Sequence, residues 1–332
     1  PALIAKDLAA ELEKEPVLKG ITIEAKGPYI NFIFGARYVS EAVMEAVKPG
    51  YGSFPKKGIR VVLEHTSANP NGPLHVGHIR NSIIGDTLAR VFRKAGYGLE
   101  VQYYVNDMGR QIAIVVWGFE NLDCTQRIGE KEDAHIARVY IAANREIEKD
   151  PTSTQQINTL MQLVEHGDPA IVKKFRGEVS RCLDGFKVTM KNLNVAHDRF
   201  VWESDFIRNG YTDRIIAKLR KLPQIRDEDT LALDLSEFGF ENKYVIRRSD
   251  GTSVYAARDL AFHAWKAANF DRVIDVLGAD HKLIAAQLQC TMKLLGEKAP
   301  EIVHFEFVSL PEGSMSTRAG KFVSADDLIT EI

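Results

Sequence analysis

A strand–helix–strand pattern between residues 59 and 105 constrains the fold of this chain more than any other feature of its sequence. A β-rich run at 59–66 leads through a loop into a helix expected at 76–95, and 100–105 then alternates as a second strand. Gly96 suits the position that follows a helix C-terminus. Because strands joined through a crossover helix run parallel, the pattern predicts an α/β fold.

The second half of the chain continues this alternation. Further strands and helices are expected in turn at 243–247, about 256–269, 272–277, 281–296 and 303–310. Residues from about 110 to 200 are predicted to be helical, with breaks at Asp150-Pro151 and Asp168-Pro169. The sequence therefore predicts a doubly wound parallel sheet with a helical insertion, a fold that binds its ligands at the carboxyl ends of the strands.

A small α+β unit is expected ahead of this fold, over residues 1–52. A helix, two strands and a second helix are expected in it at 2–14, 21–25, 29–34 and about 36–48. The Gly/Pro-rich stretch 49–55 follows as a linker. The main domain is expected to occupy 59–332.

Both ends of the chain are interpreted as cut. The chain begins at Pro1, without a Met or a targeting segment. Ser324 and the acidic residues after it have the form of a helix start, but this helix runs out at Ile332. We therefore expect a fragment that lacks a further C-terminal domain.

The composition excludes several classes of protein. The chain has no run of roughly 18 or more apolar residues, so no transmembrane helix is expected. Its three cysteines lie far apart, which predicts reduced thiols in a cytoplasmic protein rather than disulfides or a zinc site. A net charge of −2 argues against a protein that coats nucleic acid, but it is compatible with an enzyme that handles one RNA.

The residues His75-Val76-Gly77-His78 stand where the first strand turns into its helix. Helix N-termini bind phosphate, and Gly77 lets a flat ring or a phosphate approach the backbone closely. His75 and His78 can donate hydrogen bonds to a phosphate on which charge develops. The alternative is a pair of surface histidines at an ordinary helix start. We interpret the segment as the ATP site of an enzyme that adenylates its substrate.

A second candidate segment runs from Ser314 to Lys321 and contains small hydroxylated residues together with Arg318. It follows the strand expected at 303–310 and precedes the helix start at Ser324, so it suits a loop that closes over a triphosphate. Taken alone, it is equally consistent with a solvated linker. Paired with the histidine segment, it favours nucleotide binding.

Together the two segments resemble the two signature motifs of class I aminoacyl-tRNA synthetases. Longer stretches resemble arginyl-tRNA synthetases in particular, at 64–74, 79–82, 105–111, 249–261, 278–281 and 315–318. The resemblance covers nearly the whole chain. It implies a Rossmann-like catalytic domain at 59–332, a shortened N-terminal tRNA-contacting domain at 1–52, and the absence of the C-terminal anticodon-binding domain.

The resemblance also implies an activity, arginine–tRNA ligation. ATP would be a substrate, accompanied by Mg²⁺, and would activate L-arginine as its adenylate. The arginyl group would then pass to the 3′ end of tRNA(Arg), and in this family activation usually needs bound tRNA. A monomer without a membrane partner is expected.

The resemblance assigns roles to individual residues. Catalysis would involve His75, Gly77, His78, Arg318 and Lys321. ATP would be bound by His75, His78, Asp280, His281, Met315 and Ser316. Arginine would be bound by Ser67, Asn69, His78, Glu203, Tyr255 and Asp259. The Asp-His pair at 280–281 has a plainer interpretation as a helix cap with an exposed neighbour.

The proposed arginine pocket makes physical sense because a planar guanidinium with five donors suits carboxylates and a flat partner. Glu203 and Asp259 would face it. By the same resemblance Tyr255 would lie beside it. Tyr255 and Asp259 are four apart at a helix start, so their side chains would share a face. Taken singly, Glu203 could be a solvated loop acid, Asp259 a first-turn acid and Tyr255 a core residue. Asn106 and Asp107, which end the second strand, are interpreted as a turn.

One departure from the family pattern concerns the cation that faces the phosphates. The two lysine positions of the second motif are Ser314 and Thr317 here. The upstream position at which many arginyl enzymes without that lysine carry one is Gly72. Arg318, Lys321 and Mg²⁺ are the candidates for this role, although the sequence contains no dedicated metal site.

Two other functions stay open at this point. A smaller nucleotidyltransferase could use the same H-x-G-H loop on a cofactor precursor, but the long helical insertion and the set of Glu203, Tyr255 and Asp259 argue against it. A non-catalytic relative could bind arginine or tRNA as a regulator or scaffold, and the missing motif lysines favour it.

Overall fold

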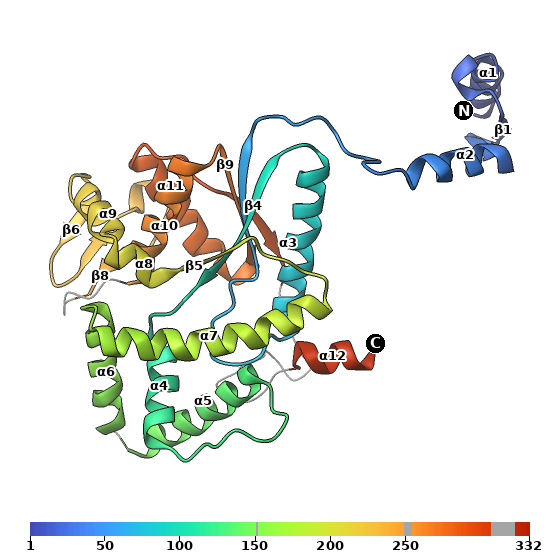
Figure 1. Cartoon of the computed structure of the whole chain (residues 1–332). Coiled ribbons are helices and arrows are strands. Elements are labelled where there is room, and N and C mark those ends of the chain that lie inside the picture. Colours follow the sequence, from blue (N-terminus) through green and yellow to red (C-terminus); the bar gives the residue numbers. More distant parts are fainter. Residues whose placement is uncertain (151, 249–253, 307–322) are drawn as a thin grey trace. The chain divides into compact units, whose positions relative to one another are not determined.

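The computed structural model describes residues 1–150, 152–248, 254–306 and 323–332. The chain divides into two compact units (Figure 1). The first comprises Pro1–Pro55 with Lys94–Gly96, and the second comprises Lys56–Arg93 with Tyr97–Ile332. Among the described helices, none is long and apolar enough to cross a membrane.

The first unit is a small α+β fold around a two-stranded antiparallel sheet. Its elements are α1 (Ala2–Leu12), a 3₁₀ turn (Pro16–Leu18), β1 (Ile21–Lys26), β2 (Tyr29–Phe34) and α2 (Ala36–Ala46). The order of these helices and strands along the chain agrees with the one expected from the sequence. Gly27 joins the strands at a φ of 59°, which glycine adopts without steric cost. A tRNA-contacting role for this unit stays a prediction.

The second unit is built on a five-stranded parallel sheet. Its strands are β3 (Arg60–Glu64), β4 (Gly98–Val105), β5 (Arg199–Trp202), β9 (Arg272–Gly278) and β10 (Glu301–Phe305), in the spatial order β10-β9-β3-β4-β5. From β3 the chain adds β4 and β5 on one side, and then β9 and β10 on the other. This reversal between β3 and β9 confirms the predicted doubly wound fold and creates a topological switch point.

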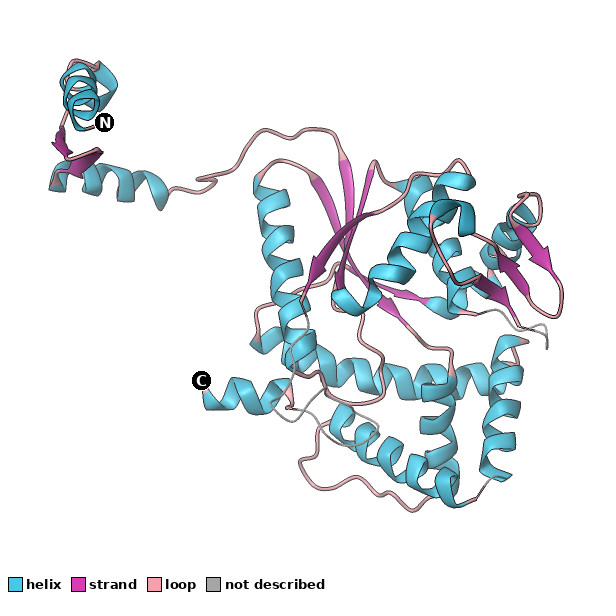
Figure 2. Ribbon diagram, turned by 180° about the vertical axis from the view of Figure 1, so that it is seen from behind, coloured by secondary structure: helices cyan, strands magenta, loops and turns pink. Residues whose placement is uncertain are grey.

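The helices of this unit fall into groups along the chain. They are α3 (Val76–Lys94), α4 (Arg110–Asn121), α5 (Glu132–Lys149), α6 (Thr152–Glu165), α7 (Pro169–Asn192), α8 (Glu203–Arg208), α9 (Tyr211–Leu219), α10 (Tyr255–Asn269), α11 (Lys282–Leu294) and α12 (Ala325–Glu331). Two 3₁₀ turns lie at Ser236–Phe238 and Ala279–His281. Figure 2 shows the strands between α3 on one side and the helices of the α10 region on the other.

Side chains of β3 alternate between these two layers. Leu63 packs with Ala89 of α3, whereas Val62 packs on the opposite face against Trp265 of α10. Because successive residues of a strand point to opposite faces, Glu64 shares the face of Val62. A carboxylate at the end of β3 is thereby directed toward α10.

The helical insertion consists of α4 to α7. The predicted breaks are confirmed, since α5 ends at Lys149 and α7 begins at Pro169. The Asp168 carboxylate accepts hydrogen bonds from the N–H groups of Ala170 and Ile171, both at 3.0 Å. An N-cap acid followed by proline is a favoured helix start.

Two expectations about strands are wrong. The strand expected at 243–247 forms as β8 (Tyr244–Arg247), but it belongs to a separate antiparallel sheet with β6 (Ile225–Asp227) and β7 (Leu231–Leu233). The parallel sheet instead contains β5, whose start lies within the region expected to be helical. Four residues are too few to show a period, so pairing with β4 rather than local sequence defines this strand.

Candidate active site at the switch point of the sheet

The loops that follow β3 and β9 enclose a cavity of about 340 Å³ at the switch point. One loop precedes α3, and the other is the short turn between β9 and α11. The predicted site residues that line this cavity are Ser67, Asn69, His75, Gly77, His78, Asp280 and His281. The fold therefore gathers in one place residues that are about 200 positions apart in the chain, at the edge where open α/β sheets bind ligands.

Hydrogen bonds fix which ring nitrogen of each motif histidine carries a proton. The His75 N–H donates to Nδ1 of His78 at 3.2 Å, and the Gly77 N–H donates to Nδ1 of His75 at 3.1 Å. The two rings stack with their centroids 3.6 Å apart. Burial lowers the pKa of His75, and burial together with the neighbouring His75 ring lowers the pKa of His78 to about 3. Both rings are therefore neutral at pH 7 with a donor at Nε2.

The loop between β3 and the histidines has an uncommon backbone conformation. Thr66 and Ser67 have φ angles of 69° and 37°, in a region that a β-branched residue rarely adopts. The Thr66 N–H donates to Oδ1 of Asn81 at 2.9 Å, and the hydroxyls of Thr66 and Ser82 lie 2.8 Å apart. The Ser67 hydroxyl donates to Oε1 of Glu64 at 2.9 Å. Strain held in place by such contacts is typical of functional sites.

One glycine is required for α3 to approach this loop. A Cβ atom on Gly85 would lie 2.2 Å from Cγ of His65, so no other residue fits there without a shift. His65 is buried, and burial lowers its pKa to about 2. The neutral His65 ring fills the space between the end of β3 and α3.

The end of the chain returns to the histidine segment. The Val76 N–H donates to the carbonyl of Val323 at 3.3 Å, and the Ala325 N–H donates to the carbonyl of Leu74 at 2.7 Å. On the other side, Phe305 at the end of β10 lines the same cavity. Val323, which follows the second candidate segment in the sequence, thus contacts the histidine segment.

Four predicted residues of that second segment lie outside the described part of the chain: Met315, Ser316, Arg318 and Lys321. The described residues that line the cavity include no Lys or Arg. The roles predicted for Arg318, Lys321 and Mg²⁺ as the cation that faces the phosphates therefore stay predictions.

The start of α10 supplies the predicted guanidinium-binding residues. Tyr255 is 55% exposed, which rules out the alternative of a core tyrosine. Together with Arg110 and Arg258 it lines a cavity of about 420 Å³ against the insertion. Asp259 lies one turn further along, and its side chain is 33% exposed. Tyr255 also lies close to Asn69, which connects it to the switch-point loop.

Glu203 is not the solvated loop acid that its plainer interpretation suggests. It begins α8, is only 2% exposed, and its Oε1 accepts a hydrogen bond from Nε of Arg258 at 2.6 Å. Its Oε2 is buried without a hydrogen-bond partner among the described residues. Burial raises the pKa of Glu203 to about 7, although Arg258 works against this rise. The Arg258 guanidinium is therefore already hydrogen-bonded to one of the two carboxylate oxygens of Glu203.

Asp107 has a larger role than the turn predicted for it. It is buried, and its carboxylate accepts from the N–H of Ser204 at 2.8 Å and from the Ser204 hydroxyl at 2.5 Å. Arg176 of α7 lies 3.3 Å from the same carboxylate. Asp107 thus connects β4, α7 and α8 and fixes the position of Glu203. Its neighbour Asn106 makes the expected turn contact, accepting from the N–H of Met108 at 3.3 Å.

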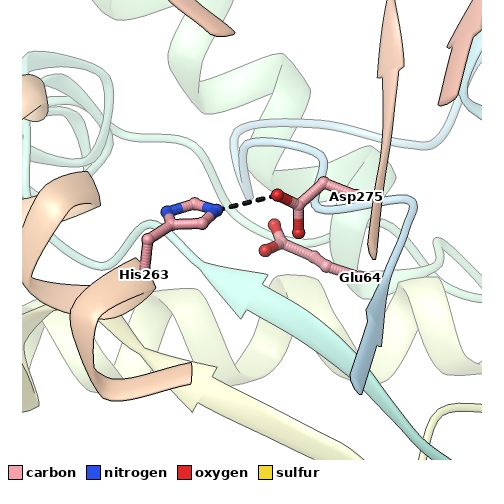
Figure 3. Close-up of side chains that lie close together, drawn as sticks. All are labelled: Glu64, His263 and Asp275. Carbon is pink, nitrogen blue, oxygen red and sulfur yellow. Dashed lines mark hydrogen bonds and ion pairs between the residues drawn. The ribbon is translucent and has the colours of Figure 1, made fainter. Parts of the chain in front are cut away.

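A buried charged cluster next to the site was missed by the sequence reasoning. Figure 3 shows the His263 ring of α10 pointing to Asp275 of β9, with Glu64 of β3 beside them. The Lys266 ammonium group lies between the two carboxylates and donates to both. These carboxylates and the imidazole are metal-ligand types in mutual reach, but Lys266 already supplies the cation.

The comparisons with known proteins agree with this geometry. A family model described as tRNA synthetases class I (R), catalytic domain, matches residues 39–332. The chain belongs to this family.

Curated relatives support the assignment to the class I (R) family. An arginine–tRNA ligase of Methanoregula boonei is 75% identical over 336 aligned residues, covering 100% of this chain and 60% of that protein. One from Methanosphaerula palustris is 63% identical with the same coverage. The chain therefore spans about three fifths of the length of these relatives.

Solved structures agree on the fold. The arginyl-tRNA synthetase of Thermus thermophilus matches with a TM-score of 0.71 at 28% identity, covering 100% of this chain and 61% of that one. A methionyl-tRNA synthetase of Mycobacterium tuberculosis matches with a TM-score of 0.52 at 14% identity, covering 82% of this chain and 62% of that one. The second match concerns the fold alone.

Proposed function

We propose that this chain is the catalytic part of an enzyme that activates L-arginine with ATP and transfers the arginyl group to tRNA(Arg). The observation that carries the proposal is the pair of neutral histidines with Nε2–H donors at the switch-point cavity. Relatives named arginine–tRNA ligase, at 75% and 63% identity, support the choice of amino acid.

In the first step, the arginine carboxylate attacks the α-phosphate of ATP in line. Pyrophosphate leaves with the electron pair of the broken P–O bond, and arginyl-adenylate remains. His75 and His78 donate their Nε2–H groups to the phosphate oxygens as negative charge builds on them. The positive end of the α3 dipole also stabilises this negative charge. Asp280 and His281 hold the ribose from the other wall of the cavity. Little covalent work falls to the protein, which mainly positions the reactants.

The arginine would lie between the loop that follows β3 and the start of α10. Ser67 and Asn69 would hold its amino-acid end within reach of the α-phosphate. Asp259 would accept hydrogen bonds from its guanidinium, with the Tyr255 ring beside it. Glu203 has one oxygen without a described partner, and this oxygen is the one that would reach the guanidinium.

The charge of the triphosphate needs a cation beyond the histidines, since both are neutral. Mg²⁺ bound to ATP is a suitable group, because it prefers phosphate and water oxygens with few protein ligands. Asp280 is the carboxylate on the described wall of the cavity and could hold such an ion through water. Arg318 and Lys321 would supply further positive charge from the second motif.

In the second step, the terminal ribose hydroxyl of tRNA attacks the activated carbonyl, and AMP leaves. tRNA(Arg) is thus the proposed partner, and the first unit is a candidate surface for it. The cytoplasm and a monomeric state remain the expectations that go with this function.

The direct test is ATP–pyrophosphate exchange by the whole protein, with each amino acid in turn, in the presence and absence of tRNA. We expect exchange that depends on arginine and that tRNA(Arg) increases. Exchange that responds to a different amino acid would contradict the proposal, and so would the absence of arginine binding in calorimetry.

The same experiment tests the two alternatives. Arginine binding without exchange, even with tRNA(Arg) present, would favour a regulator or scaffold. Adenylation of a cofactor precursor without any amino acid would favour a smaller nucleotidyltransferase. Either outcome would overturn the proposed function.

A further inference from the structure

One face of α10 contains a line of polar residues that leads from the surface into the interior of the protein. Asp259, His263 and Lys266 are spaced four and three residues apart, so they share this face. Their burial increases along the helix: the Asp259 side chain is 33% exposed, that of His263 6% and that of Lys266 0%. The outermost member is the carboxylate proposed to bind the guanidinium.

At the interior end of this line, Lys266 contacts the two strands of the switch point, β3 and β9. Glu64 and Asp275 are direct register partners on β3 and β9, and both face α10. Two carboxylates in such positions repel each other, and both are largely buried, with side chains 11% and 3% exposed. The ammonium of Lys266 donates to Glu64 and, at 2.8 Å, to Oδ1 of Asp275. These two carboxylates outweigh burial and raise the pKa of Lys266.

His263 joins this interior pair to Asp259. Its Nε2 lies 2.8 Å from Oδ2 of Asp275, and its Nδ1 lies 2.9 Å from Oδ1 of Asp259. Nδ1 also lies 2.8 Å from the Asp259 carbonyl oxygen. Both ring nitrogens face oxygen acceptors, so the ring makes both contacts only as the imidazolium, with two donors. Burial opposes the charge, but Asp259 and Asp275 outweigh it and raise the pKa of His263 to about 10.

The charged groups that face His263 are Asp259 and Lys266 on its own helix, Asp275 on β9 and Glu64 on β3. With all five groups ionised, three carboxylates and two cations leave a net charge of −1. The excess negative charge lies where the cluster opens, at Asp259. Such a cluster suits a cationic ligand and holds its outer carboxylate in one orientation.

We propose that His263, held by Asp275, is a positioning residue that orients the Asp259 carboxylate for a guanidinium ligand. This inference rests on the proposed function, because it takes Asp259 as the group that meets the arginine side chain. His263 itself does not contact the substrate. It orders one carboxylate before the ligand arrives, and such preorganisation increases affinity.

A double-mutant cycle in the whole protein tests this proposal. The variants are His263→Gln, Asp259→Asn and their combination, and the measurement is calorimetric binding of arginine and, separately, of ATP. We expect H263Q alone to weaken arginine binding about 10-fold or more, as for the loss of a charge-assisted hydrogen bond. In the D259N background the same change should cost less than about 3-fold, because the residue that His263 positions is already altered. ATP binding should change by less than about 2-fold in both backgrounds.

The matched control is His135→Gln. His135 is a buried histidine of α5 whose ring nitrogens contact the Cys124 carbonyl and Arg181. Its loss should leave arginine binding unchanged. If H263Q lowers thermal stability and weakens arginine and ATP binding equally, as a merely structural residue would, the proposal is overturned. Equal effects of H263Q in the wild-type and D259N backgrounds would also overturn it.

A second variant keeps the proposal testable if H263Q does not fold. Asp275→Asn leaves an oxygen for Lys266 but removes one of the two carboxylates that raise the His263 pKa. The His263 pKa should then fall toward neutrality. Arginine binding by D275N should weaken as the pH rises from 6.5 to 8.5, while binding by the wild-type protein stays constant. A flat profile in D275N would contradict the proposal.

The outcomes also separate this inference from the proposed function. If the wild-type protein does not bind arginine, or if D259N binds it as well as the wild type, the proposed arginine pocket itself is wrong. If D259N weakens binding and H263Q does not, the pocket stands and only the role of His263 is refuted.

Discussion

The two motif histidines act as neutral donors because of short-range contacts in their own turn. Each Nδ1 accepts from a backbone N–H of the same segment, which leaves the proton on Nε2. Burial then keeps the rings uncharged at neutral pH. In the proposed reaction, the site would therefore stabilise developing charge with hydrogen bonds rather than with full positive charges.

The substitution His78→Asn tests this role of the ring. The Asn side chain can still accept from the His75 N–H, as Nδ1 does, but it has no donor where Nε2 was. We expect arginine-dependent exchange to fall about 10²–10³-fold with little change in arginine affinity. His166→Gln, at an exposed histidine, is the control and should leave the rate unchanged.

The pH profile gives a second readout on the same residue. Because the pKa of His78 is lowered to about 3, its ring stays neutral above that value and gains a proton only when the pH falls through it. The wild-type exchange rate should therefore show no inflection from His78 between pH 6 and 8. An inflection in this range that disappears in H78N would contradict the neutral-donor account.

At the scale of elements, long-range contacts place the short helices around the site. α8 has only six residues and no side-chain cap of its own. Its start is held by Asp107, which follows β4 and accepts two hydrogen bonds from Ser204. Glu203 precedes Ser204, so the position of this acid depends on a carboxylate 96 positions earlier in the chain, at the end of a neighbouring strand.

The substitution Asp107→Ala should therefore destabilise the protein. It leaves the Ser204 N–H and Arg176 without their buried partner, and we expect the free energy of unfolding to fall by about 3 kcal/mol. Denaturant unfolding measures this loss. Asp213→Ala, at an acid whose side chain is 77% exposed, should change stability by less than about 0.5 kcal/mol. A similarly small effect of D107A would refute the capping role.

The sequence predicts those elements whose signal is local. The β3–α3–β4 unit, the breaks before Pro151 and Pro169, and the order of β9, α11 and β10 all follow from periodicity and from proline and capping positions. β5, β6 and β7 are not predicted, because strands of three or four residues have no visible period. β8 is expected as a strand, but its antiparallel pairing with β7 is not.

The predicted site residues divide in the same way. The loop residues at the switch point follow from the motif, since the carboxyl ends of the parallel strands in this fold lie at the ligand edge. The cluster around Lys266 does not, because its contact with Glu64 joins residues 202 positions apart. A signal was present, however: Asp259, His263 and Lys266 form a polar line on a helix that is otherwise largely apolar.

At the scale of the molecule, the doubly wound sheet explains why the chemistry lies where it does. The histidine segment and the β9 turn lie at the switch point between β3 and β9, and the contact of Lys266 with Glu64 joins α10 to it. We propose that the nucleotide and the amino acid bind next to each other at the carboxyl ends of β3 and β9. The chain spans three fifths of the length of its relatives, so the proposed activity belongs to the whole protein.

The most direct test of this account is a crystal structure of the whole protein with arginine and a non-hydrolysable ATP analogue. The account predicts guanidinium nitrogens within about 2.7–3.2 Å of the Asp259 carboxylate and α-phosphate oxygens at a similar distance from Nε2 of His78. The arginine carboxylate should point at the α-phosphate. Arginine bound away from α10, or an analogue whose phosphates lie outside the cavity between the β3 and β9 loops, would contradict it.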